Sequence, residues 1–222
     1  MDVVPHTTAT LAALVAGVAV DARPRVEAAG GFAVRVGVDG PVGPDTEALA
    51  DVVAAALTDR TAPVARVRAR DWLRARSLRL EAGPADPDAY YEGWHDRSAL
   101  RREVLDALGP DGAGRWLARL RDPASDRPYR EPAVAAVPGL VAVVDGPFLA
   151  RWELADAFDV VVHLDVSPAA QVRRLPPEDR DRVPPAWRRY LDETDPAPRV
   201  RAGGGLVVRF DHPDRPALVR SA

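Results

Sequence analysis

Short apolar runs that end in a turn and precede helix-like stretches constrain the fold of this 222-residue chain more than any other feature. In the clearest run, residues 140–146, five apolar residues precede an Asp-Gly pair, and residues 32–38 and 159–165 are similar. Strands that are apolar on both faces are typical of parallel sheets covered by helices on each side. We therefore predict one α/β domain over residues 1–222, a three-layer sandwich with a mostly parallel central sheet.

Local signals place further elements along the chain. Thr7 or Thr8 is the expected N-cap of a first helix, which with a linker occupies residues 1–30. Residues 64–70 alternate alanine or valine with arginine, which predicts a strand with one polar face. Ser167 followed by Pro168 predicts the start of a later helix. Residues 74–97 are irregular and carry several aromatic side chains, and we interpret them as a substrate-side insertion.

Composition excludes several classes of protein. Apolar residues make up 47% of the chain and its net charge is −3, with both signs interspersed, so we expect a globular protein that does not bind nucleic acid. The absence of cysteine excludes disulfide bonds and thiol chemistry and fits a cytoplasmic protein. The apolar run at residues 11–20 is about half the ~20 residues that span a bilayer, and the segment before it lacks arginine. We expect no membrane span and no signal peptide.

The turn after the first predicted strand lies where a phosphate-binding loop would lie, between a strand and a helix. In such a loop, glycines expose amides to phosphate, a lysine neutralises it and Ser or Thr holds Mg²⁺. When the pattern GxxxxGK[ST] is set on Gly40, with Gly43 inside it, Asp45 takes the second glycine, Thr46 the lysine and Glu47 the Ser/Thr. All 30 basic residues of the chain are arginine, so no lysine is available.

These replacements oppose the usual binding of MgATP. Pro44 removes one amide donor, and Asp45 places a carboxylate where a phosphate would rest. At an effective dielectric near 20, a like-charge contact at 4 Å costs roughly 4 kcal/mol, or about three decades of affinity. The alternative is an ordinary Gly/Pro turn that joins a strand to a helix and is capped by Asp45 or Thr46.

From about residue 32 onward the chain resembles the uridine kinase-like proteins of actinobacteria, a branch of the phosphate-loop nucleoside kinases. Individual pieces are unspecific, and the resemblance is carried by their order and spacing: Val38-Asp39-Gly40 with Leu49-Ala50, Asp71-Trp72-Leu73-Arg74, Asp86-Pro87-Asp88-Ala89-Tyr90-Tyr91, Leu100-Arg101-Arg102-Glu103-Val104-Leu105, Leu108-Gly109-Pro110, Asp122-Pro123-Ala124-Ser125-Asp126-Arg127, Val143-Val144-Asp145-Gly146, and Val162-His163-Leu164 with Ser167-Pro168-Ala169-Ala170. The resemblance implies phosphoryl transfer from MgATP to the 5′-hydroxyl of a pyrimidine nucleoside.

The resemblance also suggests roles for individual residues. Arg70 falls at the position of the catalytic acid and Asp71 beside it, so Asp71 is the candidate base, with a local cap or ion pair as the alternative. Arg173 and Arg174 fall where lid arginines are expected, within a lid-like region at about residues 173–195. Their alternative is a solvated arginine face.

Metal and substrate ligands can be suggested in the same way. Asp145 ends a buried strand and, with Glu47, is the candidate Mg²⁺ ligand, although an Asp-Gly turn is the alternative. The candidate nucleoside pocket, which could equally be internal packing, is formed by Tyr90, Tyr91, Trp94 and Arg97. His95 and His163 lack companions at metal spacing, so we expect both to be structural.

Two functions are compatible with these residues. The favoured one is a pseudokinase that binds a nucleoside, another small molecule or a protein partner without transferring phosphate, and that needs no ATP or Mg²⁺. The other is a rewired nucleoside or small-molecule kinase in which Asp71 is the base, Glu47 and Asp145 hold Mg²⁺, and an arginine replaces the missing lysine. The sequence predicts neither the identity of the ligand nor the oligomeric state.

Overall fold

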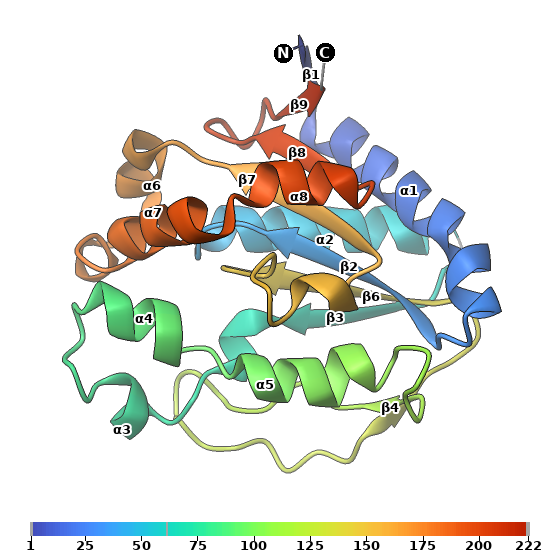
Figure 1. Ribbon diagram of the computed structural model, residues 1–222, viewed down its shortest axis with the longest axis horizontal. Helices are drawn as coiled ribbons and strands as arrows, with labels where there is room; N and C mark the ends of the chain where they lie inside the picture. The colour runs from blue at the N-terminus through green and yellow to red at the C-terminus, as the bar shows by residue number, and fades with distance from the viewer. Residues whose placement is uncertain (1, 61, 221–222) are drawn as a thin grey trace.

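The computed structural model describes residues 2–60 and 62–220 and has a central sheet between two layers of helices (Figure 1). The seven strands lie in the order β1-β9-β8-β7-β2-β6-β3. The central strands β8, β7, β2, β6 and β3 are parallel, and β9 and β1 extend the sheet in antiparallel fashion. This arrangement confirms the predicted α/β sandwich. The strands are β1 Asp2–Pro5, β2 Ala33–Asp39, β3 Val64–Arg68, β6 Leu140–Gly146, β7 Val160–Asp165, β8 Leu206–Arg209 and β9 Ala217–Arg220.

Each face of the sheet is covered by its own helices. One face packs against α1, α2 and α6, and the other against α4, α5, α7 and α8. The helices are α1 Thr8–Ala28, α2 Pro44–Thr58, α3 Arg76–Arg79, α4 Pro87–Gly93, α5 Arg97–Leu100, α6 Pro168–Arg174, α7 Val183–Thr194 and α8 Pro196–Ala202. Shorter elements are the 3₁₀ turns η1 Ala69–Trp72, η3 Ala155–Ala157 and η4 Pro177–Asp179, the π-helical segment η2 Arg101–Asp106, and the paired strands β4 Arg115–Trp116 and β5 Val134–Ala135.

Local sequence explains where several elements begin. Thr7 is the N-cap of α1: its hydroxyl accepts a hydrogen bond from the amide of Thr10 at 3.1 Å, and the Thr10 hydroxyl accepts one from the amide of Thr7 at 2.9 Å. Ser167 caps α6 in the same way, by accepting from the amide of Ala170. Every residue of β6 is buried, as its apolar run predicts. The predicted caps at Thr7 and Ser167 and the predicted buried strand are therefore confirmed.

Other expectations need correction. The stretch after residue 182 forms the helices α7 and α8, which were not predicted from the sequence. Its prolines are compatible with helix because they lie in the first turn of each, where no amide donor is required. The segment before the first helix contains β1, which pairs with β9. The strand expected at residues 64–70 ends at Arg68, and η1 begins at Ala69. The supposedly irregular insertion contains α3 and α4. No helix of the described residues is long and apolar enough to cross a bilayer.

Candidate functional site

The candidate site lies at the carboxyl ends of β2 and β6, which are neighbouring parallel strands. Their pairing sets Val38 opposite Asp145, so the turn that follows β2 lies beside this carboxylate. Ligands of open α/β sheets bind at this edge. Gly43 has a φ of 149°, which L side chains rarely adopt, and a Cβ at Gly40 would lie 2.8 Å from the Leu164 side chain. Both glycines are therefore required by the shape of the turn.

Asp45 and Thr46 lie inside the first turn of α2 and do not cap it. The N-cap is Gly43, which offers no side chain, and Pro44 follows it. The Thr46 hydroxyl is buried and donates to the Pro41 carbonyl oxygen at 2.7 Å. The expected cap by Asp45 or Thr46 is therefore wrong. Thr46 closes the turn upon itself, and Asp45 adds a negative charge at the helix N-terminus, where the helix dipole favours one.

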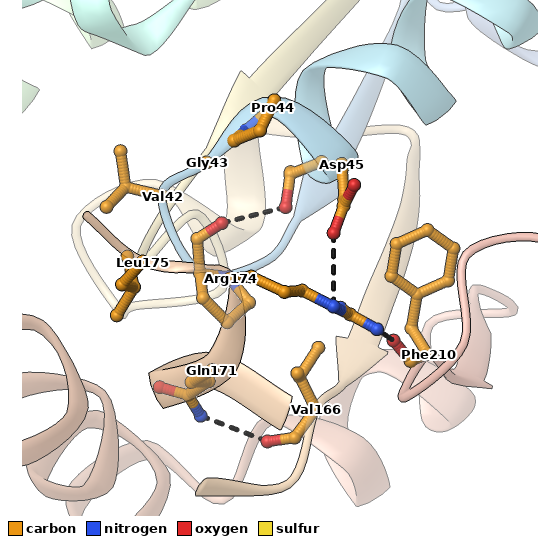
Figure 2. Close-up of a pocket in the computed structure, with 11 residues that line it drawn as sticks. Val42, Gly43, Pro44, Asp45, Val166, Gln171, Arg174, Leu175 and Phe210 are labelled. Carbon is orange, nitrogen blue, oxygen red and sulfur yellow. Dashed lines mark hydrogen bonds and ion pairs between the residues drawn. The ribbon is translucent and has the colours of Figure 1, made fainter. Parts of the chain in front are cut away.

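Asp45 is paired with an arginine of the lid-like region. The Nε atom of Arg174 lies 3.1 Å from Asp45 Oδ2, and its Nη2 atom donates to the Phe210 carbonyl oxygen at 2.9 Å. Figure 2 shows Arg174 reaching from α6 between these two partners. The cavity enclosed there measures only about 30 Å³, room for about two water molecules. Arg173, its neighbour, is exposed.

Glu47 and Asp145, the predicted Mg²⁺ ligands, also face arginines. Arg70 Nη1 lies 2.9 Å from Glu47 Oε2, and Arg66 Nη1 lies 2.6 Å from Asp145 Oδ1. Burial raises the pKa of both carboxyls, and the nearby charge of Asp145 raises the pKa of Glu47 further. The two carboxylates therefore share one half-enclosed space and are held there by guanidinium groups.

The surroundings of Glu47 and Asp145 disfavour a magnesium site. Mg²⁺ coordinates carboxylate oxygens, and one oxygen of each carboxylate, Glu47 Oε2 and Asp145 Oδ1, already lies against a guanidinium group. Within residues 2–60 and 62–220, no group of three or more His, Cys, Asp or Glu side chains could hold a metal ion. The cavity at this point measures about 10 Å³.

Arg70, and not Asp71, lines that small cavity, together with His95 and Asp145. Asp71 lies in η1, where its backbone carbonyl accepts hydrogen bonds from the amides of Leu120 and Arg121. Burial raises the pKa of the Asp71 carboxyl in spite of neighbouring arginines. A role for Asp71 as a base stays a prediction, and the side chain nearest the loop at this point is cationic.

The aromatic residues of the predicted nucleoside pocket lie in the interior. Tyr90, Tyr91 and Trp94 belong to a buried cluster, in which their exposed fractions are 3%, 1% and 7%. Arginines of the chain cover their faces: the Arg182 guanidinium is 4.2 Å from the Trp94 ring centroid, and that of Arg151 is 4.1 Å from the Tyr91 centroid. A base could stack on these rings only by displacing an arginine.

Arg97, the fourth residue of that prediction, lines a larger polar cleft. The cleft measures about 340 Å³ and is lined by Arg74, Glu92, His95, Asp96, Arg97, Ser98 and Glu153. Burial, with help from Arg97 and Arg79, lowers the pKa of His95 to about 3, so its ring is neutral at physiological pH. Its buried Nδ1 atom has no hydrogen-bond partner among the described residues. Since His95 also lines the small cavity at Glu47, it lies between the loop and the cleft.

Three solved structures that align with most of this chain are named as kinases. A possible uridine kinase from Bacillus stearothermophilus aligns with a TM-score of 0.62 and 21% identity, over 76% of this chain and 86% of that one. The fold is that of the P-loop kinases. A putative fructose transport system kinase from Silicibacter sp. aligns with a TM-score of 0.54 and 22% identity, over 87% and 93% of the two chains. D-glycerate 3-kinase from Cryptococcus neoformans aligns with a TM-score of 0.52 and 14% identity, over 90% of this chain and 94% of that one. No protein-family model matches the sequence, and the comparison with curated proteins gives no match.

The end of β2, just before the loop, is tied to α7 by a buried network that was not predicted from the sequence. Asp39, the last residue of β2, accepts hydrogen bonds from the Tyr190 hydroxyl at 2.6 Å and the Leu149 amide at 2.9 Å. Its Oδ2 atom also lies 2.7 Å from Nδ1 of the buried His163, so this ring takes part in the network. The available signal was a carboxylate that directly follows an apolar strand. The end of β2 and α7 are thus connected through the core.

Proposed function

We propose that this chain is a uridine kinase-like P-loop protein in which phosphoryl transfer from ATP is weak or lost, and which binds a nucleoside or another small molecule. One observation carries the proposal. The acidic residues at the loop, Asp45, Glu47 and Asp145, each lie within ion-pair distance of an arginine of the same chain. The arginines that could bind phosphate and the carboxylates that could bind Mg²⁺ are therefore paired with each other.

The sizes of the cavities support the same conclusion. The two cavities at the loop measure about 30 and 10 Å³, whereas the cleft beside His95 measures about 340 Å³. Pockets for small molecules are usually at least about 300 Å³. We therefore propose that the ligand binds in the cleft, whose polar lining includes Arg74, Asp96 and Ser98. We also propose a cytoplasmic location, which the absence of cysteine supports.

The test is thermal unfolding with and without MgATP. A ligand present at a hundred times its Kd stabilises by about 2.7 kcal/mol, which raises the Tm of a domain of this size by roughly 5–10 °C. We expect no saturable shift with millimolar MgATP, and a shift with a nucleoside or related small molecule. Saturable stabilisation by MgATP, or efficient phosphorylation of uridine, would refute the proposal and favour the rewired kinase, with Asp71 as base and Glu47 and Asp145 holding Mg²⁺.

A further inference from the structure

We propose that Asp45 takes the place of a bound phosphate and, by pairing with Arg174, holds α6 closed on the P-loop when no nucleotide is present. The inference goes beyond the proposed function, because it concerns the conformation of the lid-like region and requires no ligand. It begins with the position of Asp45 in the first turn of α2, a helix of 15 residues. Amides at such a helix end, together with a nearby cation, attract an anion.

Arg174 supplies that cation and is aimed by a second contact. While its Nε atom faces Asp45 Oδ2, its Nη2 atom donates to the Phe210 carbonyl oxygen, and its guanidinium carbon lies 5.8 Å from the Phe210 ring centroid. Guanidinium groups bind carboxylate and phosphate with the same planar array of donors. An arginine in this position can therefore pair with Asp45 as it would pair with a phosphate (Figure 2).

Gln171 gives an independent reason why α6 depends on this ion pair. It lies on α6, is 4% exposed and lines the same cavity. Its Nε2 atom donates to the Val166 carbonyl oxygen at 3.0 Å, but its buried Oε1 atom has no partner among the described residues. An unsatisfied buried acceptor opposes the docking of α6. The Asp45–Arg174 pair offsets that cost, and its loss should allow α6 to open.

Hydrogen exchange of residues 168–182 tests the proposal without any ligand. In Asp45→Asn we expect exchange to be about five-fold faster than in the wild type, which corresponds to about 1 kcal/mol. Asp59→Asn, at the exposed C-terminal end of the same helix, is the matched control and should leave this exchange unchanged. Arg174→Gln should reproduce the effect from the other partner, and the double variant should add nothing to it. Exchange in Asp45→Asn and Arg174→Gln equal to that of the wild type would overturn the proposal.

Inorganic pyrophosphate tests whether Asp45 occupies the place of the anion. We expect pyrophosphate to slow the exchange of α6 in Asp45→Gly and to have no effect on the wild type. Equal protection of the wild type, or no protection of Asp45→Gly, would show that Asp45 does not stand in for phosphate. The exchange experiment on the variants uses no nucleotide. If MgATP does bind, the proposed function is wrong, but Asp45→Asn should still speed the exchange of α6. The two proposals can therefore be refuted separately.

Discussion

The chemistry of the loop is set by a few charged side chains. A P-loop normally offers amides and one lysine to phosphate, whereas here Asp45, Glu47 and Asp145 face Arg174, Arg70 and Arg66, respectively. The negative charges at the loop and the arginines that neutralise them therefore both belong to the chain itself. The pairs made by Asp45 and Glu47 are only partly enclosed, so the stability each of them adds is modest. Their larger effect is to repel a polyphosphate and to occupy its potential partners.

Restoring the motif should restore nucleotide binding. The triple variant Asp45→Gly, Thr46→Lys and Glu47→Ser recreates GxxxxGKS on Gly40 and removes two carboxylates. Since one like-charge contact costs roughly 4 kcal/mol, we expect at least a ~10-fold gain in MgATP affinity, measured by titration calorimetry. Glu47→Ser alone keeps Asp45 and should show no gain. If the triple variant also fails, the backbone of the turn has itself diverged from the shape that binds phosphate.

Among the elements, α7 is tied through the core to the end of β2, just before the loop. Its Tyr190 reaches Asp39 at the end of β2, and Trp187 stacks on His163 with ring centroids 6.0 Å apart. Burial and the Asp39 carboxylate raise the pKa of Tyr190 well above its ordinary value, so its hydroxyl remains a donor at every physiological pH. The helix therefore orients the Asp39 carboxylate, which also accepts a hydrogen bond from the Leu149 amide.

Removal of the Tyr190 hydroxyl should destabilise the protein. Tyr190→Phe deletes a hydrogen bond to a buried carboxylate, and we expect the free energy of unfolding in urea to fall by about 1.5–3 kcal/mol. Tyr90→Phe is the matched control, because the buried Tyr90 hydroxyl has no partner among the described residues and its loss should be neutral or slightly stabilising. Equal effects of the two substitutions would contradict a specific role for the Asp39 network.

At the scale of the whole molecule, pH should act on stability through His95. The pKa of its ring is about 3 in the folded protein, against an ordinary value of 6.5. Below pH 6.5 the unfolded chain therefore binds a proton that the folded protein excludes, and stability falls as pH decreases. The raised pKa values of Glu47, Asp71 and Asp145 act in the opposite direction, because their folded forms retain protons more readily.

A variant isolates this contribution. His95→Gln keeps a polar side chain that does not titrate, so the comparison with the wild type cancels the effect of the carboxyls. Between pH 6 and pH 4 we expect the wild type to lose roughly 1.4 kcal/mol per pH unit more than His95→Gln, measured by urea unfolding at each pH. Parallel pH profiles for the two proteins would mean that His95 is protonated in the folded state.

The parts of this fold that can be predicted from the sequence are those set by local interactions. The apolar run of β6, the caps at Thr7 and Ser167 and the altered loop residues depend on neighbours a few positions away, and all can be recognised in the printed sequence. The carboxylate of Asp45 was recognisable in the same way. The α/β class follows from these signals, because alternating strands and helices have few ways to bury their apolar faces.

Long-range contacts account for the rest. No local signal indicates that Arg174 pairs with Asp45, that Tyr190 reaches Asp39, or that β1 and β9 meet at the edge of the sheet. Tyr90 and Trp94 likewise look like a binding surface until the packing of α4 against α7 buries them and Arg182 covers their rings. Such pairs form because folding brings distant segments together. The partner of a charge or a ring therefore depends on which segment packs beside it in the tertiary structure.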